Sequence, residues 1–404
     1  MPDDILMIIL SRLNLKEAVE TSILSRRWRF VWTYLSGVFD FDAQLLFFHQ
    51  QLIGSSRNIF AETVGNTLKQ HQGPTIAELR IRFPKHLDNQ VCEHQLHSWI
   101  DMGVKKRVKS LLIDFRMYPP QPMQPLSSFS SFTSLISLRL VRANISAEMI
   151  HHLLSNTPAL EVLSIVDSLS HFHHLKLCGP CLRLKHLELR YNAIWVLEIS
   201  AAPYLESLEL YPINRSINIF YKDVPSLTRV SYGLIFCKEL VTNSLCPQLE
   251  SLTMMALSFR SDRVYEHSAH FPAIIRNLKE IHVALNGNFR EDFHSFFRLI
   301  DASPVLTKAS FRMFWSDPYE NLEFSRHHDF ISRPKHQSLK VVEIFGFNGS
   351  DNDHELVTYL VHYAANLHKI SVKGSRYRYE GIEGCRFSKL KSMLPPSVKL
   401  EILE

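Results

Sequence analysis

The 404 residues suffice for two or three ordinary domains or for one repeat array that grows by addition, and a 46% hydrophobic fraction with 21% charged residues excludes a disordered chain. The formal net charge of +5 is too mild for the basic stripe of a nucleic-acid-binding protein. No stretch reaches the roughly 18 apolar residues of a membrane span. The acidic start is unlike a signal peptide, and the six scattered cysteines are unlike a secreted disulfide framework. We therefore expect no nucleic-acid partner, no membrane association and a cytoplasmic and/or nuclear location.

The first forty residues carry the pattern of three short helices. Apolar residues recur at helical spacing over residues 5–13. Asn14 and Glu17 have the spacing of a capping box, which predicts that a second helix begins near Leu15. A third helix rich in aromatic residues follows Ser25, which can cap it. Because so small a bundle cannot cover all its apolar side chains, the excess predicts a surface that is buried against a partner.

The residues of these three predicted helices follow the sequence pattern of one protein family. The segments Pro2 to Leu13, Lys16 to Ala18 and Thr21 to Trp32 closely resemble the F-box of plant F-box/leucine-rich-repeat proteins. The resemblance implies binding to a Skp-type adaptor, which connects the F-box to a cullin scaffold and a RING subunit. The residues carried over by position as adaptor-binding are Pro2, Ile5, Leu6, Ile9, Leu10, Leu13, Ala18, Val19 and Trp28. The family usually has Leu before the proline, where this chain has Met1, so weaker adaptor binding is an open alternative.

A second pattern, L-x-x-L-x-L with other apolar residues allowed, recurs along most of the chain. The twelve copies begin at Ile76, Val108, Leu135, Leu160, Leu184, Leu205, Leu227, Leu249, Leu278, Leu306, Leu339 and Leu367. From 135 to 249 the spacing is 21 to 25 residues, inside the range of leucine-rich repeats, and it lengthens afterwards. One such repeat cannot bury its apolar side alone, so stacking should build one parallel sheet over a continuous core.

The C-terminal segment, residues 339–404, resembles the FBD segment found at the C-terminus of many plant F-box proteins. The resemblance rests on the run from Leu339 to Gly349, an amphipathic helix predicted from His354 to about Asn366, and the strand that follows it. We expect a strand–helix–strand cap that covers the last open edge of the sheet.

The predicted fold class is α/β. It comprises a three-helix F-box over 1–40, a helical linker over 41–75, an irregular leucine-rich-repeat solenoid over 76–338 and the FBD-like C-terminal cap over 339–404. In such a solenoid, strand positions between the framework leucines face the concave side, where a substrate protein can bind. The predicted substrate-binding residues are Glu161, Ser164, Glu188, Arg190, Glu206 and Glu209.

Motifs that resemble catalytic or metal chemistry have unsuitable contexts. Cys178 and Cys181 form a C-x-x-C, but a repeat strand follows where a redox motif needs a helix. His171, His173 and His174 cluster without a spaced second pair of ligands. The basic run 105–109 is best read as a solvated turn and the proline-rich run 117–125 as an insertion between repeats. We therefore expect no catalytic residues, no metal and no cofactor.

The leading hypothesis is a non-catalytic, substrate-recruiting subunit of an SCF-type ubiquitin ligase, with an unknown substrate protein. Two alternatives stay open at this point. One is a repeat scaffold whose F-box does not engage the adaptor, and the other is a small-molecule receptor with a pocket beneath the concave rim.

Overall fold

The computed structural model comprises two compact units, and each is described here by itself. Unit 1 contains residues 1–205 and 222–224, and unit 2 contains residues 206–221 and 225–404. The structure describes residues 3–46, 55–83, 89–115, 121–122, 129, 132–168, 173–179, 183–211, 213, 217–234, 248–256, 275–286, 299–314, 335–349, 351–374 and 386–403. Within these residues no helix is both long enough and apolar enough to cross a membrane.

Unit 1 begins with the three predicted helices, each shorter than the pattern suggested. Their bounds, with two 3-10 turns, are α1 Asp3–Leu10, α2 Leu15–Glu20, η1 Thr21–Ile23, α3 Trp28–Val31 and η2 Trp32–Tyr34. The capping box is confirmed, because the Glu17 N–H donates to Asn14 Oδ1 at 2.9 Å and the Asn14 N–H donates to Glu17 Oε2 at 3.0 Å. The Trp28 N–H donates to Ser25 Oγ at 3.3 Å, as expected for a capping serine.

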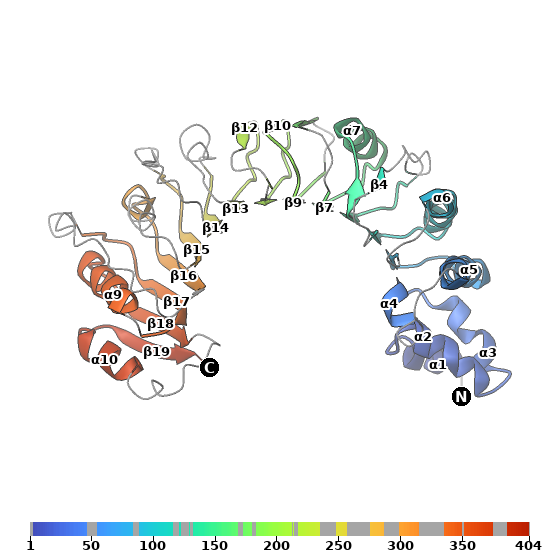
Figure 1. Ribbon diagram of the computed structural model, residues 1–404, viewed down its shortest axis with the longest axis horizontal. Helices are drawn as coiled ribbons and strands as arrows, with labels where there is room; N and C mark the ends of the chain where they lie inside the picture. Colours follow the sequence, from blue (N-terminus) through green and yellow to red (C-terminus); the bar gives the residue numbers. More distant parts are fainter. Residues whose placement is uncertain are drawn as a thin grey trace. The chain divides into compact units, whose positions relative to one another are not determined.

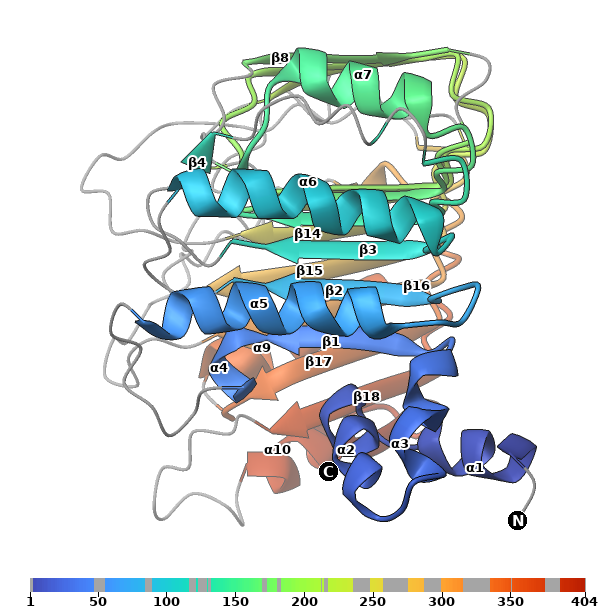
Figure 2. The same ribbon diagram turned by 90° about the vertical axis from the view of Figure 1, so that its right-hand side faces the viewer.

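The remainder of unit 1 is a parallel sheet with helices on one face (Figures 1 and 2). Its strands, in spatial order, are β1 Val38–Asp42, β2 Glu78–Arg82, β3 Ser110–Asp114, β5 Ser137–Val141, β7 Val162–Val166 and β9 His186–Arg190. The helices are α4 Ala43–Leu46, α5 Ser55–Gln70, α6 Asn89–Lys105 and α7 Ala147–Asn156. Two shorter parallel pairs join β4 Gln121–Pro122 with β6 Ala143–Asn144, and β8 His174–Cys178 with β10 Val196–Ser200.

Unit 2 also consists mainly of parallel strands. Its parallel strands are β11 Ser207–Tyr211, β13 Arg229–Leu234, β14 Ser251–Ala256, β15 Glu280–Asn286, β16 Lys308–Phe314, β17 Val341–Phe347, β18 Lys369–Gly374 and β19 Lys399–Leu403. The helices α9 Asp351–Tyr363 and α10 Arg386–Met393 follow β17 and β18, and strand β12, Asn218–Lys222, contains the division between the units.

Apolar alternation explains why these segments are strands. In β2 and β9 every second side chain is buried, for example Leu79 and Ile81, because alternate residues of a strand point to opposite faces. A backbone ladder fixes the register between repeats: one carbonyl accepts the N–H groups of two successive residues of the next repeat. The Ile136 carbonyl, for instance, accepts from Glu161 at 2.8 Å and from Val162 at 3.0 Å.

Each of the twelve predicted repeat copies contains a parallel strand. The sheet also begins earlier than the predicted boundary at residue 76, because β1 pairs in register with β2 inside the segment assigned to the F-box and the linker. The C-terminal segment is more than a strand–helix–strand cap. It contains β17, α9, β18, α10 and β19, and the last strand extends the sheet rather than covering its edge.

A buried asparagine follows strand β9. Asn192 is buried there, and its Nδ2 donates to the Ile165 carbonyl of the preceding repeat at 3.0 Å. A side-chain bond of this kind continues the repeat-to-repeat ladder beyond the end of the strand.

Candidate functional site

The N-terminal helices expose apolar side chains on one side of α1. Ile5, Ile8 and Ile9 lie one turn apart in sequence and are all exposed, with Ile8 at 62%. Leu13 follows them and is exposed at 37%. Isolated exposed apolar residues are ordinary on a protein surface, but four within nine residues form a patch that is typical of a protein interaction site.

Other predicted adaptor-binding residues do not reach this surface. Leu6, Leu10 and Ala18 are fully or almost fully buried, with Leu6 only 2% exposed. These three hold the helices together, so they occupy the motif-core places of the F-box rather than its exposed surface. The reason is that Leu6 and Leu10 lie one turn apart on the side of α1 that faces the bundle core. Val19 and Trp28 are half-buried, and Pro2 lies outside the described residues.

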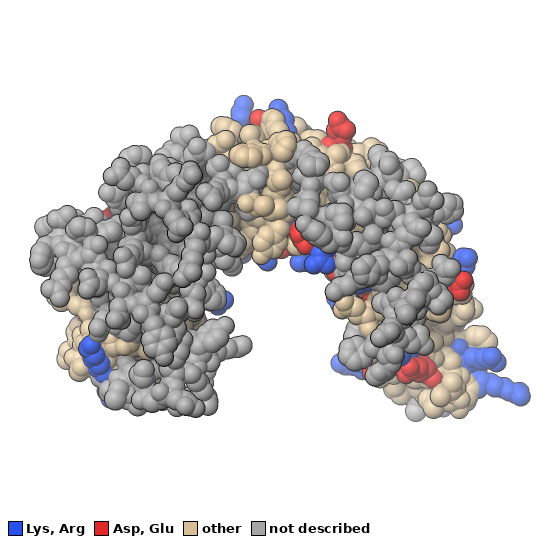
Figure 3. Space-filling view, viewed as in Figure 1, with Lys and Arg blue, Asp and Glu red and all other residues tan. Residues whose placement is uncertain are grey.

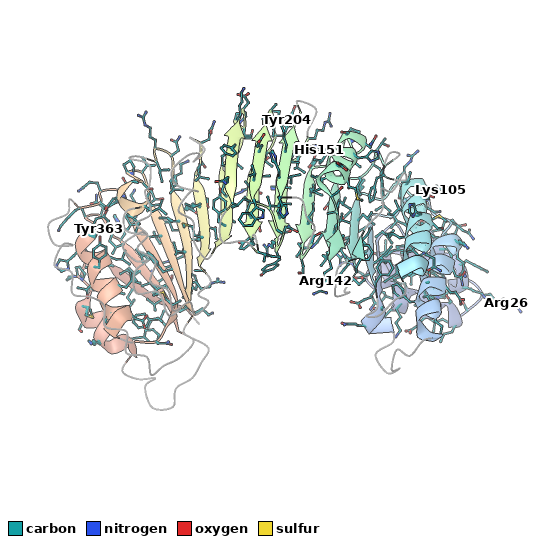
Figure 4. The ribbon with its side chains drawn as sticks, turned by 45° about the horizontal axis from the view of Figure 1, so that its top comes forward. Arg26, Lys105, Arg142, His151, Tyr204 and Tyr363 are labelled. Carbon is teal, nitrogen blue, oxygen red and sulfur yellow. The ribbon has the colours of Figure 1, made fainter. Side chains whose placement is uncertain are left out.

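Sequence reasoning missed the most exposed apolar side chains of this segment. Ile23 is 88% exposed and Leu24 is 64% exposed at the end of η1, and Phe30 on α3 is also exposed. The signal was present, since an apolar Ile-Leu pair sits beside Arg26 and Arg27 in a turn where polar residues are usual. Lys and Arg side chains project from the end of the molecule that carries these helices (Figure 3), and Figure 4 shows Arg26 pointing outward there.

The N-terminal helices are joined to the first repeat by a buried junction. The N–H groups of Gln72 and Gly73 donate to the Thr33 carbonyl at 2.8 and 3.0 Å. His71 Nε2 lies 2.8 Å from the Leu35 carbonyl, and Lys106 Nζ donates to the carbonyl of His71 at 2.7 Å. These bonds fix the apolar helical surface relative to β1 and β2.

We call the side of each sheet opposite the helices the strand face. In unit 1 its first strands carry an interleaved set of charges. Arg80 donates from Nε to Glu78 Oε1 at 2.7 Å and from Nη2 to Glu78 Oε2 at 2.8 Å, and its Nη1 is 3.5 Å from Asp40 Oδ2. The hydrogen bond to Glu78 raises the pKa of Arg80 against the opposing effect of burial. Arg82 Nη1 is 2.5 Å from Asp40 Oδ1 and 3.8 Å from Asp42 Oδ2.

A second cluster centres on Glu188, one of the predicted substrate-binding residues. Its carboxylate accepts a hydrogen bond from Ser164 and lies 3.3 Å from Arg139 and 2.6 Å from Arg190. The structure thus brings together three predicted residues, Ser164, Glu188 and Arg190. Ser164 is nevertheless buried beneath this cluster, where its hydroxyl group holds the Glu188 carboxylate in place.

The other predicted strand-face residues are more dispersed. Glu161 pairs with Lys185 at 3.0 Å, and in unit 2 Glu206 pairs with Arg229 at 3.5 Å. Glu209 is half-buried on β11. Arg142 lies on the side of the unit 1 strands away from α7 and its His151 (Figure 4) and is 2.8 Å from Asp167.

The motifs that resemble catalytic or metal-binding sites have structural explanations where the structure describes their residues. Cys178 is exposed at the end of β8, whereas Cys181 and His171 lie outside the described residues. His174 Nε2 is 2.9 Å from Glu198 on the neighbouring strand β10. In the basic run, Lys106 has a specific structural role at the His71 junction rather than being a solvated turn residue.

Comparison with known families gives two matches. The sequence model of the At1g61320/AtMIF1 LRR domain matches residues 120–395, and the F-box domain model matches residues 1–39. The first match covers more than half of the chain and includes most of the predicted repeats and most of the C-terminal segment. The second covers the exposed apolar helices.

Individual relatives from Arabidopsis thaliana agree. The F-box protein At1g80960 is 35% identical over 117 residues, which are 28% of this chain and 23% of the relative. The F-box/FBD/LRR-repeat protein At2g04230 is 33% identical over 115 residues, 28% of this chain and 24% of the relative. The F-box/LRR-repeat protein At1g55660 is 24% identical over 303 residues, 60% of this chain and 81% of the relative. The first two matches thus span about a quarter of the relatives' length.

Fold, surfaces and relatives together define a plant F-box/LRR protein, in which F-box helices precede a strand-rich repeat region. The chain belongs to the family of the At1g61320/AtMIF1 LRR domain. An F-box implies binding to a Skp-type adaptor, and proteins of this kind are generally non-catalytic adaptors.

Proposed function

We propose that this protein is the substrate-recognition subunit of an SCF-type ubiquitin ligase. The observation that carries the proposal is the set of exposed apolar side chains on a segment that matches the F-box domain, residues 1–39. Burial of exposed apolar area drives most protein association. The F-box helices bind the Skp-type adaptor, which connects them to the cullin and RING subunits, and the repeats bind the substrate protein.

In this role the chain positions the substrate protein and does not itself catalyse the transfer of ubiquitin. A ligase of this type holds a substrate lysine near a ubiquitin-charged conjugating enzyme and thereby raises its effective concentration. The buried junction between Thr33 and Gly73 supports such a role, because it connects the adaptor-binding helices firmly to the repeats. We place this function in the cytoplasm and/or the nucleus, in keeping with the small number of scattered cysteines.

Co-purification of the full-length chain with a plant Skp-type adaptor tests the proposal. The affinity of the Ile5→Ser/Ile9→Ser variant for the adaptor should be at least roughly tenfold lower, because burying one such side chain stabilises a complex by about 1.5–3 kcal/mol. The control is Val305→Ser in unit 2, which removes a side chain of similar exposure, 40%. Leu6 is unsuitable, because its replacement would weaken the bundle itself.

Two results would contradict the proposal. The first is failure of the wild-type chain to retain any adaptor, and the second is equal retention by the wild type and the Ile5→Ser/Ile9→Ser variant. Circular dichroism of each purified variant confirms that a lost interaction does not reflect a lost fold.

A further inference from the structure

Strand β19 of unit 2 has a partner strand on one side only. It pairs in parallel with β18 (Figure 1), and no strand among the described residues pairs with its other side, which we call the open edge. The Lys399 N–H donates to the His368 carbonyl at 2.8 Å, toward β18. Because the backbone groups of successive residues in a strand point to opposite edges, those of Leu400 and Ile402 point to the open edge.

The register with β18 shows that apolar side chains are also exposed beside this edge. Leu400 and Ile402 lie opposite Ile370 and Val372, which are both fully buried on the helix side of the sheet. Leu400 is only half-buried, and Ile402 is 52% exposed. A further strand at the open edge would remove part of this apolar surface from water, which favours its addition.

Strand β19 lacks common features that block the addition of a strand. Natural edge strands are often protected by a proline, a bulge or a covering helix. The residues of β19 include no proline, and their register with β18 is continuous. Among the described elements β18 is the main one that β19 contacts, whereas in unit 1 helix α2 packs against the edge strand β1.

The charge beside the open edge favours an acidic segment. On the strand face, Glu401 accepts a hydrogen bond from Ser371 at 2.9 Å and lies 2.7 Å from Lys369. The hydrogen bond from Lys369, followed by that from Ser371, lowers the pKa of Glu401, so this carboxylate stays ionised and balances Lys369. Lys399 is exposed, and no carboxylate of the described residues lies within ion-pair distance of it. A residue opposite Lys399 on an added strand should therefore be glutamate or aspartate.

We propose that the open edge of β19 binds an extended segment of the substrate protein, which adds to the sheet as a further strand. The backbone groups of Leu400 and Ile402 form the ladder with this segment. Apolar residues at alternate positions of the segment cover Ile402 on the helix side, and an acidic residue next to them in sequence pairs with Lys399 on the strand face. The inference rests on the proposed function for the identity of the partner as the substrate protein.

Fluorescence anisotropy of the full-length chain with a labelled peptide tests this assignment. The peptide contains Glu-Val-Thr-Val-Glu, which places the valines on one side of a strand and the glutamates on the other and has the same pattern in both strand directions. It should bind more tightly than the matched Gln-Val-Thr-Val-Gln peptide. A peptide with N-methyl groups on Val-Thr-Val should not bind, because it lacks the backbone donors of the ladder.

Substitutions at the edge separate the backbone from the charge. Ile402→Pro removes the N–H that points to the open edge and should lower the affinity roughly tenfold, whereas Ile402→Val keeps that N–H and should bind as the wild type does. Lys399→Gln should weaken binding of the glutamate peptide roughly threefold and leave binding of the glutamine peptide unchanged. Thermal unfolding of each variant confirms that the fold is retained, and if Ile402→Pro fails to fold, the N-methylated peptide and Lys399→Gln decide.

Several outcomes overturn the assignment. These are equal binding of the N-methylated and unmodified peptides, wild-type affinity in Ile402→Pro, an equal loss in Ile402→Val, and wild-type affinity of Lys399→Gln for the glutamate peptide. Self-association of the chain that Ile402→Pro abolishes, without peptide binding, also overturns it, because the edge then binds a second copy. Adaptor co-purification runs in parallel. If adaptor binding fails while Ile402-dependent peptide binding persists, the ligase role fails and the strand-addition site stands.

Discussion

At the residue scale, His71 illustrates how one buried side chain joins two parts of unit 1. Its ring packs edge-on against Phe39 with the ring centres 5.1 Å apart, and its Nε2 faces the Leu35 carbonyl at 2.8 Å. Donation from Nε2 to that carbonyl leaves Nδ1 unprotonated, and Nδ1 is buried without a hydrogen-bond partner among the described residues. Burial lowers the pKa of His71, the hydrogen bond to Leu35 opposes this, and Lys106 lowers the pKa further.

A pH dependence follows from that lowered pKa. The unfolded chain binds a proton at about pH 6.5, whereas folded His71 binds it only at lower pH. The stabilisation is therefore complete above about pH 6.5 and decreases as the pH falls toward the folded pKa. Because the chain has 21 histidines, the relevant quantity is the difference in unfolding free energy between the wild type and His71→Gln. Urea unfolding between pH 7.5 and pH 5 should show that difference shrinking, and a constant difference would contradict the account.

Residue-scale detail was only partly predictable from the sequence. The motif match identified the segment but not which side of α1 faces the core, so Leu6 and Leu10 were grouped with Ile5 and Ile9. Helical spacing separates these pairs onto different sides, but only packing against α3 shows which side is buried. The exposure of Ile23 and Leu24 likewise depends on the 3-10 turn that follows α2, which the spacing of apolar residues does not predict, although the arginines nearby in sequence indicate an exposed segment.

At the element scale, Gly346 permits an irregularity in β17. Its φ is +84°, a conformation that side chains rarely adopt, and the register with β18 shifts between Phe345 and Phe347. An added Cβ would lie 2.2 Å from the Met313 carbonyl oxygen of the neighbouring strand β16. The bulge therefore requires glycine for both its backbone conformation and the close approach.

Gly346→Ala should consequently lower the unfolding free energy by about 3 kcal/mol, from backbone strain and the clash with Met313. The matched control is Gly37→Ala, where an added Cβ meets no atom within 4 Å, and its effect should be within about 1 kcal/mol of zero. Thermal unfolding of the full chain measures both. Equal midpoints for the two variants would argue against the strained bulge.

Strands were far more predictable than their connections. Each L-x-x-L-x-L copy marked a strand, because a repeat strand buried on its helix side needs apolar residues at fixed positions. The pattern did not predict strand β1, because Leu35 precedes Phe39 by four residues, one more than the pattern allows. It did not predict strand β19 either, because Ser397 occupies the first position, where the pattern needs an apolar residue. Strands β8 and β10 fit the same pattern, as Ile194, Leu197 and Ile199 show for β10, but they were not predicted because they fall between copies already assigned to the repeats.

At the scale of the whole molecule, each unit carries a distinct surface. Unit 1 contains the apolar F-box helices and a strand face whose arginines pair with carboxylates of the same sheet. On the strand face of unit 2, the Arg312 guanidinium lies over the Phe345 ring. The composition predicted a large core and the absence of a dense basic stripe, but it could not predict a local excess of cations, because the charge of +5 is distributed over the whole chain. Register places Arg312, Phe345 and Lys373 in one row, and it is known only from the paired strands.

The measurement that tests the central claim most directly is a calorimetric titration of a plant Skp-type adaptor into the full-length chain at several temperatures. The account predicts binding with a negative heat-capacity change, because the exposed apolar side chains of the F-box become buried. It also predicts that Ile5→Ser/Ile9→Ser weakens the binding and makes the heat-capacity change smaller in magnitude, while Val305→Ser changes neither. Absence of binding, or binding that the Ile5→Ser/Ile9→Ser variant leaves unchanged, would contradict the claim that these helices recruit the adaptor.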